Sequence, residues 1–425
     1  MSSICQKSQC TMCNACATIC PQKCISSERH GNMYYMVVDQ AKCVGCHLCE
    51  KVCPNLNATQ MSNSEKCYVS WTLDEKIRRT SASGGVAAAL YSYAISSGMY
   101  IAGVRMEENF EAHYKVTNDP KDIVSFQNSK YTFSFTDDTY REIAELLKNG
   151  QVAMFIGLPC QVAGLKNYLH VRKVDTSQLY TVDLICHGTP MPEYLQEHIH
   201  SIEEKKRFRA DKVYFRDPRY GTGNFLFTIY GKQKISIKDR KFSAIKKQAS
   251  PAYKKLVISD DLYQIGYHNG WIYRDCCYQC YYAQKARVGD LTIADYHGLG
   301  KLAPYHGSYK NVSCILVNNK TGQQLIDQLQ KDSLIYLEER ILQEPYTYDP
   351  QLSHPSKGGV EQKRFVQYMA VGDRFTEAAK KAFGKTAFRN HVKEVTGYYW
   401  IMTGIKSCIP SGVKNFINKR RWKRK

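Results

Sequence analysis

One cysteine-rich run occurs twice near the N-terminus, and it constrains this chain more than any other feature. The run covers residues 10–21 and recurs 33 positions later at residues 43–54, with the spacing C-x2-C-x2-C-x3-C-P in both copies. The first three cysteines of such a run lie in a tight loop and reach three corners of one 4Fe-4S cubane, whereas the fourth begins a helical turn that points away. Each run therefore completes the cluster of the other, and the pattern predicts two clusters.

This segment resembles a two-cluster bacterial ferredoxin, which implies a small α+β ferredoxin-like domain. A pair of zinc knuckles is the alternative, but zinc sites take four ligands as two close pairs, whereas each run here supplies three ligands plus one. Cys5 and Cys24 lie outside the pattern, and we interpret them as spare thiols. The predicted ligands are Cys10, Cys13, Cys16 and Cys53 for the first cluster, and Cys43, Cys46, Cys49 and Cys20 for the second.

The composition agrees with cysteines that are reduced and free to bind metal. The chain has 425 residues, 43% of them hydrophobic, so more than one domain with a substantial core is expected. The N-terminus lacks a charged segment followed by an apolar one, and no apolar run of about 18 residues occurs. We therefore expect a cytoplasmic protein whose 18 cysteines do not form a disulfide framework.

The pattern of the remaining chain predicts three domains. A ferredoxin-like domain at 1–60 is followed, after a polar linker at 54–66, by an α/β domain at 61–345 and by a helical, basic extension at 346–425. Alternating strand-like and helix-like stretches are typical of an α/β domain with a mostly parallel or mixed sheet. Strands are predicted at 67–71, 99–105, 151–157, 179–185, 211–216, 225–230, 290–294 and 312–317, and helices at 84–97, 138–149, 160–169, 191–204 and 320–331.

Four cysteines far from the N-terminus raise the question of a third metal centre. Cys160 and Cys186 each follow a predicted strand, and ligands collect beyond the carboxyl ends of strands in open α/β sheets. Cys277 and Cys280 add a C-x2-C pair. Four sulfurs that converge on one point would suit another 4Fe-4S cluster.

Each of these cysteines also has a simpler interpretation. A single buried cysteine is a common core residue. Cys160 after Gly-x-Pro looks like a nucleophile elbow, and Cys186 beside His187 looks like a thiol next to a base, although adjacent residues on a strand face opposite sides. We interpret three further cysteines as structural: Cys67, Cys314 and Cys408.

A small polar turn at residues 81–86 is a weaker signal for a bound phosphate. Its sequence, Ser-Ala-Ser-Gly-Gly-Val, precedes an apolar helix, and such a turn presents backbone N–H groups at the positive end of the helix. Ordinary helix capping is the alternative. No Walker A sequence and no G-x-G-x-x-G after a strand occurs, so a conventional dinucleotide fingerprint is absent.

Taken together, these residues resemble the coenzyme F-420 hydrogenase/dehydrogenase beta-subunit family over about residues 65–345. One departure is His297, because relatives commonly have an aromatic residue there, often tryptophan. The matching stretches are Ser81–Val86, Ser129–Tyr131, Gly157–Lys166 (GLPCQVAGLK), Asp183–Pro190 (DLICHGTP) and Cys277–Gly298 (CYQCYYAQKARVGDLTIADYHG).

The resemblance implies cofactors and residues to hold them. Relatives bind FAD, usually beside a 4Fe-4S cluster, so a third cluster is expected with Cys160, Cys186, Cys277 and Cys280 as its ligands. Contacts with the flavin are expected from Ser83, Gly84, Gly85 and Lys130, with Asp295 near the cofactor.

The predicted function is that of an iron–sulfur flavoprotein oxidoreductase. It would relay electrons between 4Fe-4S clusters, FAD and an unidentified donor or acceptor, either a redox partner protein or a small molecule. Many relatives are encoded among surface-polysaccharide genes, and the resemblance therefore suggests a role in surface-polysaccharide metabolism. The alternatives are a ferredoxin-like carrier that only docks a partner, and a zinc-stabilised interaction protein.

The positive charge of the chain is concentrated at its C-terminus. Residues 385–425 hold 11 of the lysines and arginines against one acid, Glu394, and the formal net charge of the whole chain is +20. Aromatic residues and isoleucines interleave with this charge from 398 to 425, which predicts peripheral contact with anionic lipid at the inner face of the membrane. A solvated tail is the alternative, and no nucleic-acid recognition motif accompanies the charge.

Overall fold

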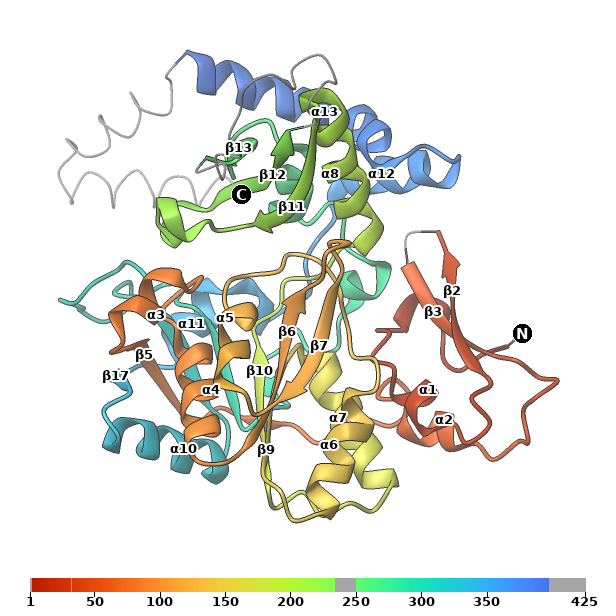
Figure 1. Ribbon diagram of the computed structural model, residues 1–425, viewed down its shortest axis with the longest axis vertical. Coiled ribbons are helices and arrows are strands. Elements are labelled where there is room, and N and C mark those ends of the chain that lie inside the picture. Colours follow the sequence, from red (N-terminus) through yellow and green to blue (C-terminus); the bar gives the residue numbers. More distant parts are fainter. Residues whose placement is uncertain (1, 32, 234–249, 397–425) are drawn as a thin grey trace, which may run out of the picture.

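The computed structural model describes residues 2–31, 33–233 and 250–396 (Figure 1). The basic segment at 398–425 and Cys408 lie outside the described residues. None of the helices in the described ranges has both the length and the apolar character that crossing a bilayer requires.

The N-terminal cysteine runs fold as two copies of one local structure. Helices α1 (Ala15–Ile19) and α2 (Leu48–Val52) each begin after a left-handed residue inside the run, Asn14 or His47, and each ends at the fourth cysteine. The N-terminal sheet, in the order β1-β3-β2, stands beside them. Its antiparallel strands are β1 (Ser2–Ser3), β3 (Met33–Val38) and β2 (Ile25–His30).

A nine-stranded mixed sheet forms the centre of the molecule, in the order β17-β5-β16-β15-β10-β9-β6-β7-β8. Strands β15, β10, β9 and β6 are mutually parallel, whereas β16, β5 and β17 continue the sheet with antiparallel pairs. The strands are β5 (Lys66–Thr72), β6 (Tyr100–Met106), β7 (Ala112–Thr117), β8 (Ser134–Phe135), β9 (Ala153–Gly157), β10 (Leu179–Leu184), β15 (Leu291–Asp295), β16 (Ser313–Val317) and β17 (Ile335–Arg340).

Helices cover both faces of the central sheet, as the side chains of β9 show. Ala153 and Phe155 enter the core that includes residues of α6 and α7, whereas Met154 and Ile156 enter the core that includes residues of α4 and α10. Successive residues of a strand face opposite sides, so a strand buried on both faces is apolar throughout. The covering helices are α3 (Glu75–Thr80), α4 (Val86–Ser96), α5 (Ile123–Phe126), α6 (Thr139–Lys148), α7 (Pro159–Val171) and α10 (Lys320–Lys331).

Two of the predicted strands of the α/β domain belong to a separate small sheet, in the order β11-β12-β13. This sheet lies above the central sheet in Figure 1 and packs with four helices around a core of aromatic residues that includes Phe365, Phe375 and Phe383. Its antiparallel strands are β11 (Phe208–Tyr214), β12 (Leu226–Gln233) and β13 (Tyr253–Leu256), and the helices are α8 (Pro192–Lys206), α9 (Leu262–His268), α12 (Gly359–Ala370) and α13 (Phe375–Val395).

The N-terminal segment packs on the central part of the molecule through its cysteine loops. In Figure 1 it lies beside α6 and α7, and both α1 and α2 contact α7. A short pair of strands, β4 (Ser62–Asn63) and β14 (Ala286–Arg287), joins the end of the predicted linker to the segment that follows Cys280. The cysteine runs therefore lie close to the cysteines of the central part.

Candidate metal centres and cofactor pocket

The structure brings the cysteines predicted for the first cluster around one cavity. We call Cys10, Cys13, Cys16 and Cys53 the first set; all four are buried, and they line this cavity together with Cys5. Burial, assisted by the neighbouring Cys53 and Cys10, raises the pKa of Cys13 to about 12. No histidine or carboxylate lines the cavity. A donor set of thiols alone fits an iron–sulfur cluster, whose charge would offset the mutual repulsion of the thiolates.

The cysteines predicted for the second cluster lie nearer to the surface. The second set is Cys20, Cys43, Cys46 and Cys49, of which Cys46 is exposed and the others are partly buried. Helix α1 lies within the first cysteine run and α2 within the second, and the two helices contact each other. The second set therefore offers the more accessible place for electrons to enter or leave the chain.

The third set combines the four distant cysteines. Burial, followed by the charges of Cys277 and Cys280, raises the pKa of Cys186 to about 12. Burial raises the pKa of Cys160, at the start of α7, well above its usual value. The nearby thiols of Cys280, Cys186 and Cys13 (of the first set) add to this rise. Cys277 lies in the short helix at Asp275–Gln279, and Cys280 ends that helix. The structure thus brings these thiols together and places them next to the first set.

A buried arginine that no sequence motif indicates, Arg274, contacts both the first and the third set. The guanidinium of Arg274 donates to the carbonyl of Thr11, within the first cysteine run, and to Oγ1 of Thr189. Burial raises the pKa of Cys160, and the positive charge of Arg274 opposes this effect; the same charge adds to the interaction with Cys276 that lowers the pKa of Cys277. The only local signal is its position directly before the cysteine-rich segment at 275–280.

An additional thiol lies against each of the three sets. Cys5 lines the same cavity as Cys10 and Cys53, and its interaction with Cys10 lowers the pKa of that thiol to about 6. The Sγ atoms of Cys24 and Cys20 are 3.4 Å apart. Cys276 directly precedes Cys277 of the third set, and the interaction of the two thiols lowers the pKa of Cys277. These thiols can donate to a ligand sulfur, a contact that tunes a cluster without binding its iron.

The predicted phosphate turn is held against the ends of β5 and β16. Ser83 Oγ donates to the carbonyl of Val312 at 2.8 Å, and the N–H of Gly84 donates to Ser313 Oγ at 3.0 Å. A Cβ atom on Gly84 would lie 2.5 Å from the carbonyl oxygen of Ser70, so only glycine permits this approach. Gly85 precedes α4 with a φ of +80°, which leaves the first N–H groups of that helix directed toward the turn.

Arg216 connects this turn with Asp295, which ends β15. Its guanidinium forms an ion pair with the Asp295 carboxylate, donates to the carbonyl of Ala82 at 2.6 Å and donates to the hydroxyl of Tyr131 at 2.7 Å. Burial opposes ionisation of Asp295, but the charge of Arg216 lowers the pKa of this carboxyl below its usual value. Arg216 was not predictable from the sequence, because its partners are distant in the chain and no motif surrounds it.

A pocket of about 410 Å³ lies close to Arg216, because Phe225 borders both. Phe225 lines the pocket, and the Arg216 guanidinium packs over its ring in a cation–π contact, 3.8 Å from the ring centre. His268 lines it as well; burial and the Arg216 charge lower the pKa of His268 to about 4, so this imidazole is neutral at pH 7. The pocket has the size and the mainly apolar lining of a small-molecule site.

Lys130 does not point to the turn. Its ammonium donates to the carbonyl oxygens of Ser125, Phe126, Gln127 and Asn128 at 2.8–3.3 Å, and so it holds the chain at the end of α5. A direct bond from this ammonium to a phosphate would replace one of these contacts. The role of Lys130 toward a cofactor stays a prediction, as do those of Ser83, Gly84, Gly85 and Asp295.

Comparisons with known proteins assign most of the chain. Residues 150–341 match the C-terminal family model, and residues 67–137 the N-terminal family model, of the "Coenzyme F420 hydrogenase/dehydrogenase, beta subunit"; residues 9–57 match a 4Fe-4S dicluster domain. Among solved structures, a chain of the F420-reducing [NiFe] hydrogenase complex from Methanosarcina barkeri is similar, with 16% identity and a TM-score of 0.42 over 76% of this chain and 92% of that one. No curated protein matches.

Proposed function

We propose that this chain, which belongs to the coenzyme F420 hydrogenase/dehydrogenase beta-subunit family and carries a 4Fe-4S dicluster domain, is an oxidoreductase that relays electrons through three cysteine-bound clusters to FAD. The observation that carries the proposal is the sequence of contacts from the surface to the pocket. The second set, which includes the exposed Cys46, is followed by the buried first set, and Cys13 of the first set lies close enough to Cys160 of the third to add to the raised pKa of that thiol.

The contacts continue from the third set to the pocket through aromatic side chains. Burial raises the pKa of Tyr267 well above its usual value, and the nearby Cys186 adds to this rise. The ring of Tyr267 stacks on that of Tyr131 with a centroid separation of 4.3 Å, and Tyr131 accepts a hydrogen bond from Arg216. These packed side chains connect the third set with Arg216 and with Phe225 at the pocket.

The residues around the turn suit a phosphate-bearing aromatic cofactor. The N–H groups at the start of α4 favour an anion, and Arg216 supplies a positive charge beside the turn. The pocket lined by Phe225 and His268 offers apolar surface for a ring system. When bound, a flavin couples one-electron traffic to two-electron or hydride chemistry.

Cofactor analysis of the anaerobically purified chain tests this proposal. Three filled sets correspond to about twelve iron atoms per chain, together with one flavin. About eight irons without flavin would support the alternative of an electron carrier that only docks a partner. Zinc without iron would contradict both. Precursors of surface polysaccharides are the first substrates to assay with the loaded protein.

Replacement of Arg216 tests the position of the flavin. Arg216→Ala removes a charged donor next to the turn, and hydrogen bonds to charged groups contribute about 1.5–3 kcal/mol, so flavin affinity is expected to fall at least about tenfold. Iron content is expected to stay unchanged. Arg209→Ala, at an exposed position of β11, is the matched control and keeps the flavin. Full flavin occupancy in Arg216→Ala would place the cofactor elsewhere.

A further inference from the structure

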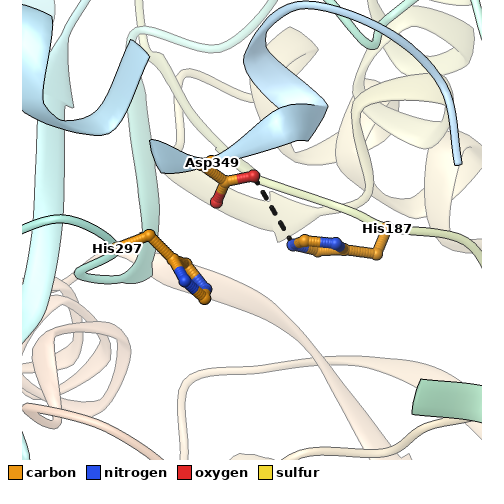
Figure 2. Close-up of side chains that lie close together, drawn as sticks. All are labelled: His187, His297 and Asp349. Carbon is orange, nitrogen blue, oxygen red and sulfur yellow. Dashed lines mark ion pairs between the residues drawn. The ribbon is translucent and has the colours of Figure 1, made fainter. Parts of the chain in front are cut away.

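Two histidines and one aspartate meet beyond the carboxyl ends of β10 and β15. His187 follows Cys186 after β10, His297 lies two residues after the end of β15, and Asp349 follows α11 (Gln343–Tyr348). One ligand atom from each lies within 4.8 Å of the others, and His187 Nε2 is 3.6 Å from Asp349 Oδ1. Figure 2 shows the two imidazoles on either side of the carboxylate.

We propose that His187, His297 and Asp349 bind one divalent cation of the zinc class. Two imidazoles and one carboxylate are a common set of three protein ligands for such an ion, and they leave at least one position open. Bond lengths of about 2.0–2.1 Å in a tetrahedral site place neighbouring ligand atoms roughly 3.4 Å apart. The observed separation of 3.6 Å between His187 and Asp349 is close to this value.

The Asp349 carboxylate is buried next to the two imidazoles. The Asp349 side chain is only 2% exposed, and its Oδ1 accepts from the N–H of Gln351 at 3.0 Å. Among the described residues, no lysine or arginine forms an ion pair with Asp349, and the positive charge near it could come only from the two imidazoles. A buried carboxylate needs a positive partner, and a bound cation would supply one.

Two glycines hold the histidines in place. Gly188 and Gly298, each directly after one of the histidines, have φ values of +136° and +83°. A Cβ atom on Gly188 would lie 2.3 Å from the ring of Tyr273, and one on Gly298 would lie 2.4 Å from the ring of Tyr348. Tyr348 precedes Asp349, so the second contact fixes the His297 loop against the carboxylate. The ligands are thus positioned before an ion arrives.

A second group with similar composition already has a cationic side chain beside it. Asp260, His391 and Glu394 also lie within ligand distance of one another. The ammonium of Lys255, however, is 2.7 Å from Asp260 Oδ1 and 3.4 Å from Glu394 Oε2. A cation already neutralises these carboxylates, so this group supplies a matched control rather than a second site.

The open position of the ion would take an oxygen ligand. Zinc with three protein ligands binds a water or a substrate oxygen and polarises it. The site lies at the same edge of the central sheet as Asp295 and Cys186, where β15 and β10 end. A carbonyl or carboxylate oxygen of a small molecule is therefore the expected ligand. Binding of the cation does not depend on the proposed flavin.

The test is zinc binding to anaerobically prepared protein with filled clusters, because occupied cysteines cannot compete for zinc. Equilibrium dialysis against Zn²⁺, with zinc and iron measured together, is expected to show one tightly held zinc per chain. His297→Ala and Asp349→Asn are expected to weaken binding at least about tenfold, since loss of even a residue that only supports a ligand costs about 10–100-fold. His391→Ala is expected to bind zinc like the unaltered chain.

X-ray absorption spectroscopy at the zinc K edge adds a readout that is independent of affinity. The expected spectrum contains two imidazole ligands and oxygen ligands without sulfur. An unaltered chain that holds no zinc, equal zinc in all variants, or a spectrum with sulfur ligands would overturn the proposal. Unchanged iron content in Asp349→Asn shows that the variant has folded, so loss of zinc there reports on the site itself.

Discussion

Cys53→Ala is expected to lower the iron content of the anaerobically purified chain from about twelve to about eight atoms. Cys53 belongs to the second cysteine run by sequence, yet it lines the cavity of the first set with Cys10, Cys13 and Cys16. Its loss should therefore remove the cluster of the other run. Iron analysis and electron paramagnetic resonance of the reduced protein measure the effect.

Cys314→Ala is the matched control for this experiment. Cys314 is also buried, but it lies on β16 with its Sγ atom 3.8 Å from that of Cys67 and belongs to none of the three sets. The control should keep about twelve irons. The interleaved arrangement would be contradicted by a Cys53→Ala protein that retains the cluster of the first run and loses that of the second.

Asp183→Ala is expected to lower the free energy of unfolding by about 3–5 kcal/mol, the usual cost of leaving one member of a buried ion pair alone. Asp183 and Arg287 are 0% and 2% exposed, and Arg287 Nη2 lies 2.7 Å from Asp183 Oδ1. The other carboxylate oxygen accepts from the N–H groups of Val288 and Gly289 at 3.0 and 2.8 Å.

This ion pair also positions the third set. Asp183 lies on β10, three residues before Cys186, and Arg287 lies on β14, seven residues after Cys280. Loss of the pair should therefore reduce iron at the third set as well as stability. Urea unfolding followed by circular dichroism measures the stability change. Glu145→Gln, which alters an exposed pair with Lys148, should leave the unfolding midpoint unchanged; an equally small effect of Asp183→Ala would contradict the prediction.

Local patterns predicted the elements that bury one or two apolar faces. The helices at 84–97, 138–149 and 160–169 correspond to α4, α6 and α7 within a few residues. The strand at 151–157 corresponds to β9, whose continuous apolar run reflects burial on both faces. In such segments the same residues determine both the local structure and the side that becomes buried.

Local patterns did not predict which strands pair with one another in the sheets. Segments 211–216 and 225–230 are strands, as expected, but they pair with each other in the small sheet rather than in the central one. Strands β7, β8 and β17 were not predicted, because strands at or next to the edge of the sheet, with partly exposed side chains, lack a strong apolar pattern. A strand pattern indicates a pleated segment, and its neighbour depends on the whole chain.

The sequence alone determined the local ligand geometry of the cysteine runs, because cysteines separated by two or three residues are held within reach of one metal cluster by the covalent backbone itself. Only the tertiary structure brought Cys160, Cys186, Cys277 and Cys280 together, paired Arg216 with Asp295, and placed His187 and His297 beside Asp349. These groups come from segments far apart in the chain. Their proximity depends on the order of strands in the central sheet and on the packing of loops at its edge, which no short stretch of sequence encodes.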